Sequence, residues 1–159
     1  MFTLCELPLG PGRIGICPLP GRWGDYAGDL ARISDWRPDL VISLITANEF
    51  EVSEADGLSA DLAAAGIAWR HLPVRDFRCP APGVETAWAN LSSEARAVLA
   101  RGGRVLVHCY GGCGRSGMAL LRLMVEEGEA PDAALARLRA VRPCAVETPG
   151  QFAWASAAA

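Results

Sequence analysis

Residues 108–117, His-Cys-Tyr-Gly-Gly-Cys-Gly-Arg-Ser-Gly, give the strongest indication of how this chain folds. It follows a short apolar and β-branched run, residues 105–107, and precedes an apolar segment of helix-forming residues, 118–125. The stretch is therefore expected to be a loop that joins a buried strand to the N-terminus of a helix. Around its glycines it places a cysteine, Cys109, and an arginine, Arg115.

The loop supplies the groups that bind a phosphate dianion. Its backbone amides can turn inward, and the first turn of the following helix adds unpaired N–H groups and the positive end of the helix dipole. The glycines permit the close backbone approach and the positive φ that such a ring of amides needs. Arg115 offers a planar fork that can bind two phosphoryl oxygens. The same field stabilises a thiolate, so Cys109 is expected to be a nucleophile at neutral pH.

Composition and charge exclude several other classes of protein. The chain has 159 residues, a net charge of −3 and 21% charged residues without a basic stripe, so nucleic acid and anionic membranes are poor partners. Its longest strand-like apolar run, residues 40–45, is far shorter than a membrane span, and the N-terminus does not resemble a secretion signal. We expect one cytoplasmic, monomeric domain over residues 1–159, with its core at about residues 12–155 and a frayed tail at 157–159.

Hydrophobic periodicity and turn signals predict alternating strands and helices, which is the order of an α/β fold. The expected elements before the loop are strands near residues 13–17, 40–45, 67–72 and 104–108, and helices near residues 26–36, 58–65 and 85–100. Three further helices are expected after the loop. The second of them has Pro131 in its first turn and is stopped by Pro143.

The loop fits the pattern His-Cys-x-x-Gly-x-x-Arg-Ser, and with it the chain resembles the cysteine-dependent protein phosphatases. Within their dual-specificity group it is most similar to the kinase-associated phosphatase branch. The resemblance extends to residues 14–21, 72–76 and 145–151, and it spans about residues 12–155. It implies a central, mostly parallel sheet of about four or five strands flanked by helices on both faces, with the active loop at the C-terminal end of a central strand.

The resemblance also implies a general acid, because the family places an aspartate in a Pro-x-x-Asp segment. Here that residue is Asp76, after the strand at residues 67–72. A proton donor must come from another segment, since the phosphate loop offers only amides and a cation. The alternative is that Asp76 caps a turn or pairs with Arg75 or Arg78.

The resemblance also implies roles for three further residues. Ser116 would donate a hydrogen bond to the Cys109 thiolate when that sulfur leaves in the second step, although a serine at a helix start can also be an N-cap. His108 points away from the nucleophile if strand alternation holds, and would organise the loop rather than act as a base. Gln151 would orient the hydrolytic water. The alternative is that it faces solvent and only caps the start of a helix.

The cysteines do not suggest a disulfide framework. The chain has six, an even number, but their spacing is irregular and one is the expected thiolate. Cys113 departs from the family, whose members carry an aliphatic or small residue there. It either fills that space or captures an oxidised Cys109 as a disulfide, with Cys79 as a rival partner. Buried apolar positions are expected for the remaining cysteines, Cys5, Cys17 and Cys144.

We therefore expect a metal-independent, cofactor-free phosphatase that acts on phosphotyrosine, with phosphoserine and phosphothreonine as further candidates, through a cysteinyl-phosphate intermediate. The catalytic residues would be Cys109, Arg115, Asp76, Ser116 and Gln151, and the loop residues Tyr110, Gly111, Gly112, Cys113, Gly114 and Arg115 would bind the substrate. The partner would be a phosphorylated protein or peptide. The alternatives are a catalytically weak phosphate-binding module of the same fold, a phosphatase of a non-protein phosphomonoester, or a zinc site, which lacks a fourth clustered ligand.

Overall fold

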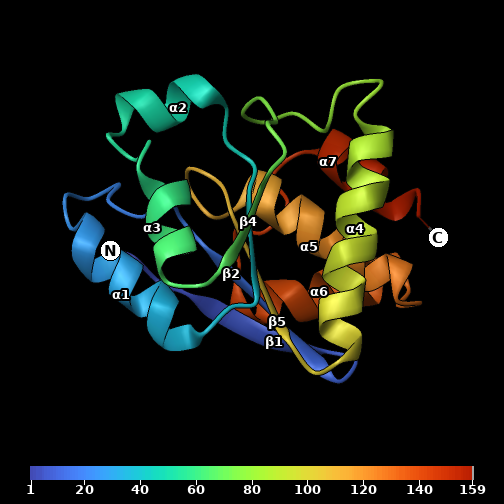
Figure 1. The fold of residues 1–159 in the computed structure, drawn as a ribbon. Coiled ribbons are helices and arrows are strands. Elements are labelled where there is room, and N and C mark those ends of the chain that lie inside the picture. The colour runs from blue at the N-terminus through green and yellow to red at the C-terminus, as the bar shows by residue number, and fades with distance from the viewer. Residues whose placement is uncertain (159) are drawn as a thin grey trace.

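The computed structural model describes residues 1–158, which form a five-stranded sheet flanked by helices (Figure 1). The strands are β1 (Cys5–Leu9), β2 (Gly12–Cys17), β3 (Leu40–Ser43), β4 (Ala68–His71) and β5 (Arg104–His108). The helices are α1 (Tyr26–Trp36), α2 (Ala47–Val52), α3 (Leu58–Ala64), α4 (Glu85–Ala100), α5 (Gly114–Glu126), α6 (Pro131–Val141) and α7 (Pro149–Ser156). The last residue of the expected frayed tail, Ala159, lies outside the described residues.

The sheet is mostly parallel, as the sequence predicts. Its strand order is β1-β2-β5-β3-β4, and only the β1–β2 pair is antiparallel. Strand β5 lies in the centre, and its residues Val105, Leu106 and Val107 are fully buried. Such a strand is apolar on both faces because helices cover both sides of a parallel sheet. The phosphate loop follows β5 and therefore lies at the C-terminal end of the central strand.

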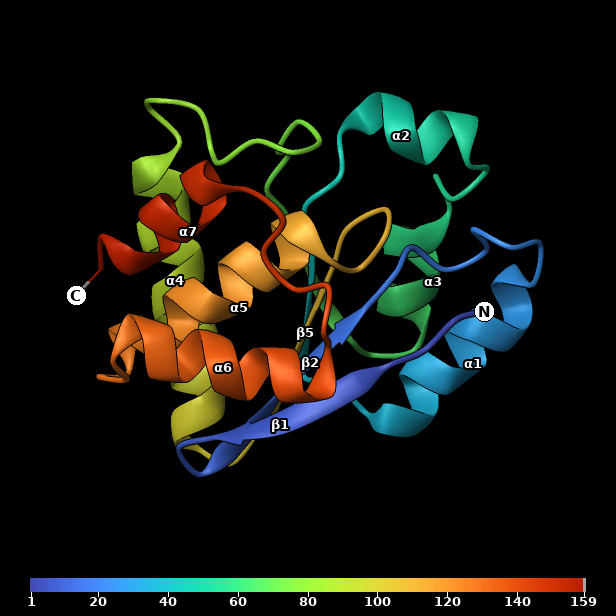
Figure 2. The ribbon, with the colours of Figure 1, turned by 180° about the vertical axis from the view of Figure 1, so that it is seen from behind.

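The helices cover both faces of the sheet. Helices α1 and α3 lie on one side, and α4, α5, α6 and α7 lie on the other (Figures 1 and 2). Helix α2 lies beyond the end of the sheet where the parallel strands finish. The phosphate loop and the loop after β4 lie at this same end. The fold thus brings these three segments together at one end of the sheet. Each helix among residues 1–158 is too short or too polar to cross a lipid bilayer.

Two elements are additions to the predicted order. Strand β1 pairs with β2 through a tight turn in which Gly10 has a φ of 56°, a conformation that two-residue hairpins require. Pro8 lies within β1, which an edge strand tolerates. Helix α2 has only six residues and so is too short to show a helical period, but Thr46 and Glu49 form a capping box at its start.

Candidate active site

Cys109 lies directly after β5, and its side chain is only 2% exposed. Its Sγ atom is 3.3 Å from the hydroxyl oxygen of Ser116, which is fully buried in the first turn of α5. The N-cap of α5 is Cys113 and not Ser116, so the alternative capping role of Ser116 is wrong. The serine hydroxyl instead faces the sulfur.

The carbonyl groups of the loop point outward, where each accepts hydrogen bonds. Tyr110 O accepts from Leu19 N at 3.2 Å, Gly111 O and Gly112 O accept from Arg142 at 3.0 and 2.8 Å, and Cys113 O accepts from Gly117 N at 2.9 Å and Val146 N at 3.3 Å. In a trans peptide the carbonyl and the next amide point in opposite directions, and the chain has no cis peptide among its described residues. The amides of residues 111–114 therefore point inward.

These inward amides form a ring of donors. Within residues 1–158, none of the backbone amides of residues 110–116 donates a hydrogen bond to another protein group. Gly112 has a φ of 67°, and a Cβ atom there would lie 2.5 Å from the backbone of Cys17. A run of unpaired N–H groups beside a buried sulfur is the arrangement expected of an anion site.

Arg115 completes the ring of donors. Its side chain is 1% exposed, and its two terminal nitrogens donate to the two carboxylate oxygens of Glu49, both at 2.8 Å. One of them also donates to Val74 O at 2.9 Å. Its Nε–H is buried and has no protein partner. This donor is therefore free to bind a phosphoryl oxygen.

Charge keeps the Arg115–Glu49 pair ionised. Burial alone would lower the pKa of Arg115, but the hydrogen bonds to Glu49, and then the negative charges of Cys109 and Asp76, raise that pKa above its usual value. Burial likewise opposes ionisation of Glu49, yet its pKa lies below the usual value because Arg115 and the amide of Thr46 donate to its carboxylate. The guanidinium is thus a fixed positive charge beneath the loop.

Glu49 is a site residue that the sequence analysis missed. The same carboxylate closes the capping box of α2, where it accepts from Thr46 N at 2.8 Å, and binds the arginine of the loop. The pattern Thr-x-x-Glu at residues 46–49 was the signal that could have located this short helix. No local sequence pattern indicated that Glu49 would contact Arg115.

Asp76 lies at the same site, on the loop after β4. Its carboxylate is 3.2 Å from a terminal nitrogen of Arg115 and accepts from Phe77 N at 3.1 Å. The salt bridge is therefore with Arg115 rather than with Arg75 or Arg78, the alternative partners. Asp76 is 54% exposed and lines the same hollow as Cys109, which has a volume of about 270 Å³.

Aromatic side chains and side chains of both charges line the rim of this hollow. Phe77 is 58% exposed with a φ of 58°, and Tyr110 also lines the hollow. The guanidinium of Arg22 lies 4.6 Å from the centre of the Tyr110 ring, which is a cation–π contact. Glu147 adds a negative charge to the lining. The hollow thus offers flat apolar walls above the ring of donors.

His108 is fully buried and points away from the sulfur. Its Nε2 atom is 2.5 Å from the Ser43 hydroxyl oxygen, which also accepts from the indole nitrogen of Trp69 at 2.8 Å. The backbone carbonyl of Cys109, 3.4 Å from Nδ1, can only accept, so Nδ1 carries the proton of the neutral ring and Nε2 accepts the hydroxyl proton of Ser43. Burial lowers the pKa of His108 to about 4, so the ring is neutral at pH 7.

Gln151 is in α7 and forms a capping box with Thr148. It is fully buried and not solvent-facing, because its side-chain oxygen accepts from the amides of Glu147 and Thr148 at 2.9 and 3.2 Å. Its side-chain nitrogen is 3.4 Å from Arg78 O. Gly114 lies beside it, since a Cβ atom at that glycine would lie 3.0 Å from the same nitrogen. The amide thus lies next to the phosphate loop.

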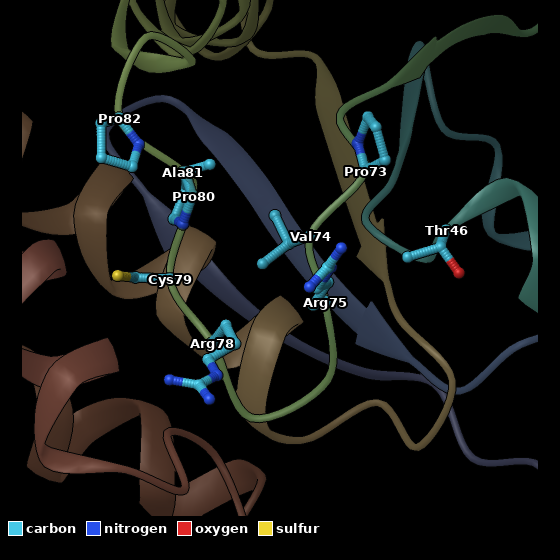
Figure 3. A pocket seen from close by; sticks show the side chains of 9 residues that line it. All are labelled: Thr46, Pro73, Val74, Arg75, Arg78, Cys79, Pro80, Ala81 and Pro82. Carbon is cyan, nitrogen blue, oxygen red and sulfur yellow. The ribbon is translucent and has the colours of Figure 1, made fainter.

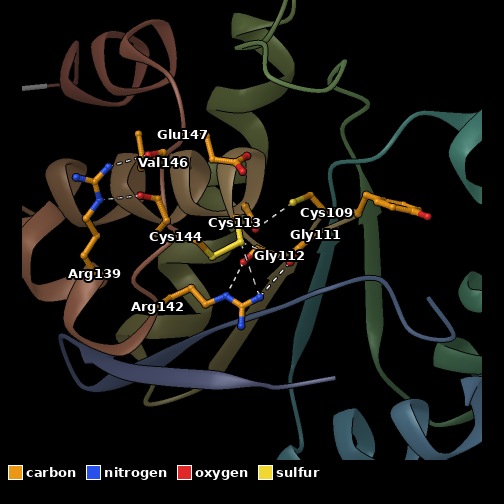
Figure 4. Close-up of a disulfide and its surroundings, with 12 residues drawn as sticks. Cys109, Gly111, Gly112, Cys113, Arg139, Arg142, Cys144, Val146 and Glu147 are labelled. Carbon is orange, nitrogen blue, oxygen red and sulfur yellow. Dashed lines mark hydrogen bonds between the residues drawn. A yellow bond between two sulfur atoms is a disulfide. The ribbon is translucent and has the colours of Figure 1, made fainter. Parts of the chain in front are cut away.

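The expectation for the cysteines was wrong at Cys113 and Cys144 and only partly right at Cys5, which is half-buried rather than buried. Cys113 and Cys144 form a disulfide with a Cα–Cα distance of 5.2 Å, within the usual range (Figure 4). Cys144 is exposed rather than buried, and Cys113 is bonded to it rather than free to capture Cys109. Cys17 is buried as expected, and burial raises the pKa of its thiol well above the usual value. Cys5 and Cys79 are free and half-buried.

A larger hollow, of about 560 Å³, lies beside the loop after β4 (Figure 3). Its lining includes Thr46, Val74, Arg75, Arg78 and Cys79, but neither Cys109 nor the phosphate loop. The groups suited to chemistry on a phosphate ester therefore lie in the smaller hollow. Residues 1–158 contain no cluster of three or more His, Cys, Asp or Glu side chains that could hold a metal ion.

Comparisons with known proteins identify the family of the chain. The model of a family described as "Polymorphic toxin system, DSP-PTPase phosphatase" matches residues 28–129. Cyclin-dependent kinase inhibitor 3 of Mus musculus is 28% identical over 146 residues, which are 87% of this chain and 68% of the mouse protein.

Solved structures show the same fold. Kinase associated phosphatase, with a serine in place of its catalytic-site cysteine, matches with a TM-score of 0.85 and 21% identity over 97% of this chain and 92% of that chain. Tk-PTP in its active form matches with a TM-score of 0.73 and 28% identity over 90% of this chain and 88% of that chain. The expected α/β phosphatase fold and the resemblance to the kinase-associated branch are confirmed.

Proposed function

The chain belongs to the DSP-PTPase phosphatase family of polymorphic toxin systems, and from this membership we propose that it hydrolyses phosphorylated protein side chains through a cysteinyl-phosphate intermediate. One observation carries the proposal. The buried sulfur of Cys109 lies beside a run of unpaired inward amides and the unpaired Nε–H of Arg115. These donors would hold the three equatorial oxygens of a phosphoryl group while the sulfur attacks in line.

In the first step the thiolate of Cys109 attacks phosphorus, so that an S–P bond forms as the P–O bond to the substrate breaks. Asp76 gives its proton to the departing oxygen. Its exposed carboxylate lines the hollow with Cys109, which supports this role. Asp76 is paired with Arg115 in the structure, so a phosphate dianion that binds Arg115 would compete with the Asp76 carboxylate for the guanidinium.

In the second step water attacks the cysteinyl phosphate, and the ionised Asp76 accepts a proton from it. The P–S bond breaks, and Ser116, 3.3 Å from the sulfur, donates a hydrogen bond to the departing thiolate. Gln151 would orient the water. Its side-chain oxygen is already used in the helix cap, so the group available to the water is an N–H of its amide. No metal or cofactor is required.

The lining of the hollow supports phosphotyrosine as substrate, with phosphoserine and phosphothreonine as further substrates. Phe77 and Tyr110 offer flat surfaces on which a phenyl ring can pack. Among the residues that line the hollow, Arg22 is the one cation, whereas a phosphorylated inositol ring would need more positive charges. The partner we propose is a phosphoprotein or phosphopeptide met in the cytoplasm by a monomeric enzyme. A net charge of −3 disfavours nucleic acid.

The test is hydrolysis of an aryl phosphate and of phosphotyrosine and phosphothreonine peptides in the presence of a chelator. Cys109→Ser should abolish turnover, and Asp76→Ala should slow it most on substrates with poor leaving groups. Cys5→Ser, at a free cysteine of β1, and Asp35→Ala, at an exposed residue of α1, are matched controls that should keep full activity. Turnover by Cys109→Ser would refute the mechanism.

The same assay separates the alternatives. A catalytically weak phosphate-binding module would bind tungstate, a tetrahedral anion, but release no phosphate from any substrate. A phosphatase of a non-protein phosphomonoester would cleave the aryl phosphate but neither peptide. Loss of activity with the chelator would contradict metal independence.

A further inference from the structure

A single side chain holds two consecutive carbonyls of the phosphate loop. Arg142 follows α6 and donates from Nε to Gly112 O at 2.8 Å and from a terminal nitrogen to Gly111 O at 3.0 Å (Figure 4). Among residues 1–158 it is the only group with an N–H or O–H that bonds these two oxygens. Both residues are glycines, which by themselves leave the backbone many conformations.

The direction of these carbonyls decides the direction of the amides that bind phosphate. When Arg142 holds Gly111 O and Gly112 O outward, the trans peptides turn the amides of Gly112 and Cys113 inward. Arg142 is itself half-buried and lies outside the hollow that contains Cys109. It can therefore act on the substrate only through the loop, as a positioning residue.

The disulfide ties the segment that carries Arg142 to the same loop. Cys113 is part of the loop, and Cys144 lies two residues after Arg142 across Pro143. A turn closes this segment, because Ala145 N donates to Arg142 O at 2.9 Å. The covalent bond therefore keeps the guanidinium within reach of its two carbonyls.

We propose that Arg142 and the Cys113–Cys144 disulfide, together called the outer brace, hold the phosphate loop in its anion-binding conformation. The proposal deepens the proposed function and rests on it for its effect on catalysis. It also makes the site sensitive to reduction. A dithiol would give two electrons and two protons to the disulfide, the S–S bond would break to two thiols, and the dithiol would become a cyclic disulfide.

Reduction is sterically possible because the sulfur-bearing residues are accessible. Cys144 is exposed and Cys113 is half-buried. After reduction, only hydrogen bonds hold the segment at residues 142–146 to the loop, so the segment separates from the loop more readily. The glycines then gain conformations in which the amides no longer converge. Phosphate binding should weaken, although no group that touches phosphate has changed.

The first experiment measures binding of tungstate by calorimetry, which needs no turnover and so does not depend on the proposed function. Arg142→Met should bind tungstate about tenfold more weakly than wild type, because two charge-assisted hydrogen bonds that order the loop are lost. Arg142→Lys, with a single donor group, should be intermediate. The matched control is Arg137→Met within α6, since Arg137 donates to Pro8 O and Glu129 rather than to the loop.

The second experiment reduces the wild-type protein with dithiothreitol, so that no variant has to fold. Thiol counting should rise from the four free cysteines to six. The reduced protein should then bind tungstate several-fold more weakly and show a raised KM with a smaller change in kcat. The double variant Cys113→Ala/Cys144→Ala should match the reduced protein and not respond to dithiothreitol, while Cys5→Ala should behave as wild type.

The proposal is overturned if folded Arg142→Met, or fully reduced wild type, binds tungstate as tightly as oxidised wild type. If anion binding follows the expected order but no form releases phosphate from any substrate, the brace stands and the proposed function fails. Aryl phosphate turnover in the same samples makes the two outcomes distinguishable.

Discussion

Lowering the pH from 7 to 5 should destabilise the protein chiefly through one buried ring, that of His108. Burial lowers its pKa from the usual 6.5 to about 4. In the unfolded chain the ring regains its usual pKa and takes up a proton near pH 6.5, whereas the folded protein does not. The stability due to the neutral ring is therefore complete above pH 6.5 and is lost progressively as the pH falls toward 4.

The size of the loss follows from the two pKa values. The difference between a pKa of 6.5 in the unfolded chain and about 4 in the folded protein corresponds to roughly 3 kcal/mol of folding stability in total. Between pH 7 and pH 5 the share lost is roughly 2 kcal/mol, because the unfolded ring is almost fully protonated at pH 5 while the folded ring stays neutral. The pKa values of Glu6 and Glu49 lie below the usual 4.5. The stability that these two carboxylates contribute is therefore lost mainly below pH 5.

The measurement is the free energy of unfolding in urea at pH 7, 6 and 5, without reductant so that the disulfide stays closed. Wild type should lose roughly 2 kcal/mol over this range, and His108→Gln, although less stable throughout, should lose much less. His71→Gln is the matched control, since His71 is the other histidine of the chain and is only half-buried. An equal loss in wild type and His108→Gln would refute the reasoning.

Three further changes test the site. Glu49→Gln should raise KM for an aryl phosphate about tenfold with a smaller change in kcat, because one charged hydrogen bond to Arg115 is lost; an unchanged KM would show that Arg115 needs no such support. Gly112→Ala should lower the free energy of unfolding in urea by roughly 2 kcal/mol, since its φ is 67° and its Cβ would meet the backbone of Cys17 at 2.5 Å; a loss of only a few tenths would contradict the close packing. Phe77→Ala should raise KM about fivefold for a phosphotyrosine peptide but little for a phosphothreonine peptide; equal effects would remove Phe77 from ring recognition.

The parts of the fold that depend on neighbours in the chain could be predicted. Helices α1 and α4 begin and end where periodicity and turn residues place them, and β5 lies directly before the loop. Strand β1 and helix α2 were missed although each has a local signal, the turn at Gly10 and the capping box of Thr46 and Glu49. Their short lengths hide the period on which such predictions depend.

The α/β order and the phosphate loop with Cys109 and Arg115 could be predicted from the residues alone, and Asp76 as the expected acid could be predicted through family resemblance. These features are contiguous in the chain or carried by a motif. Two contacts become visible only in the folded chain: Glu49 binds Arg115, 66 residues away, and Cys113 bonds Cys144, 31 residues away. Such pairs depend on how separate elements pack, and no spacing along the chain encodes which distant side chains will meet.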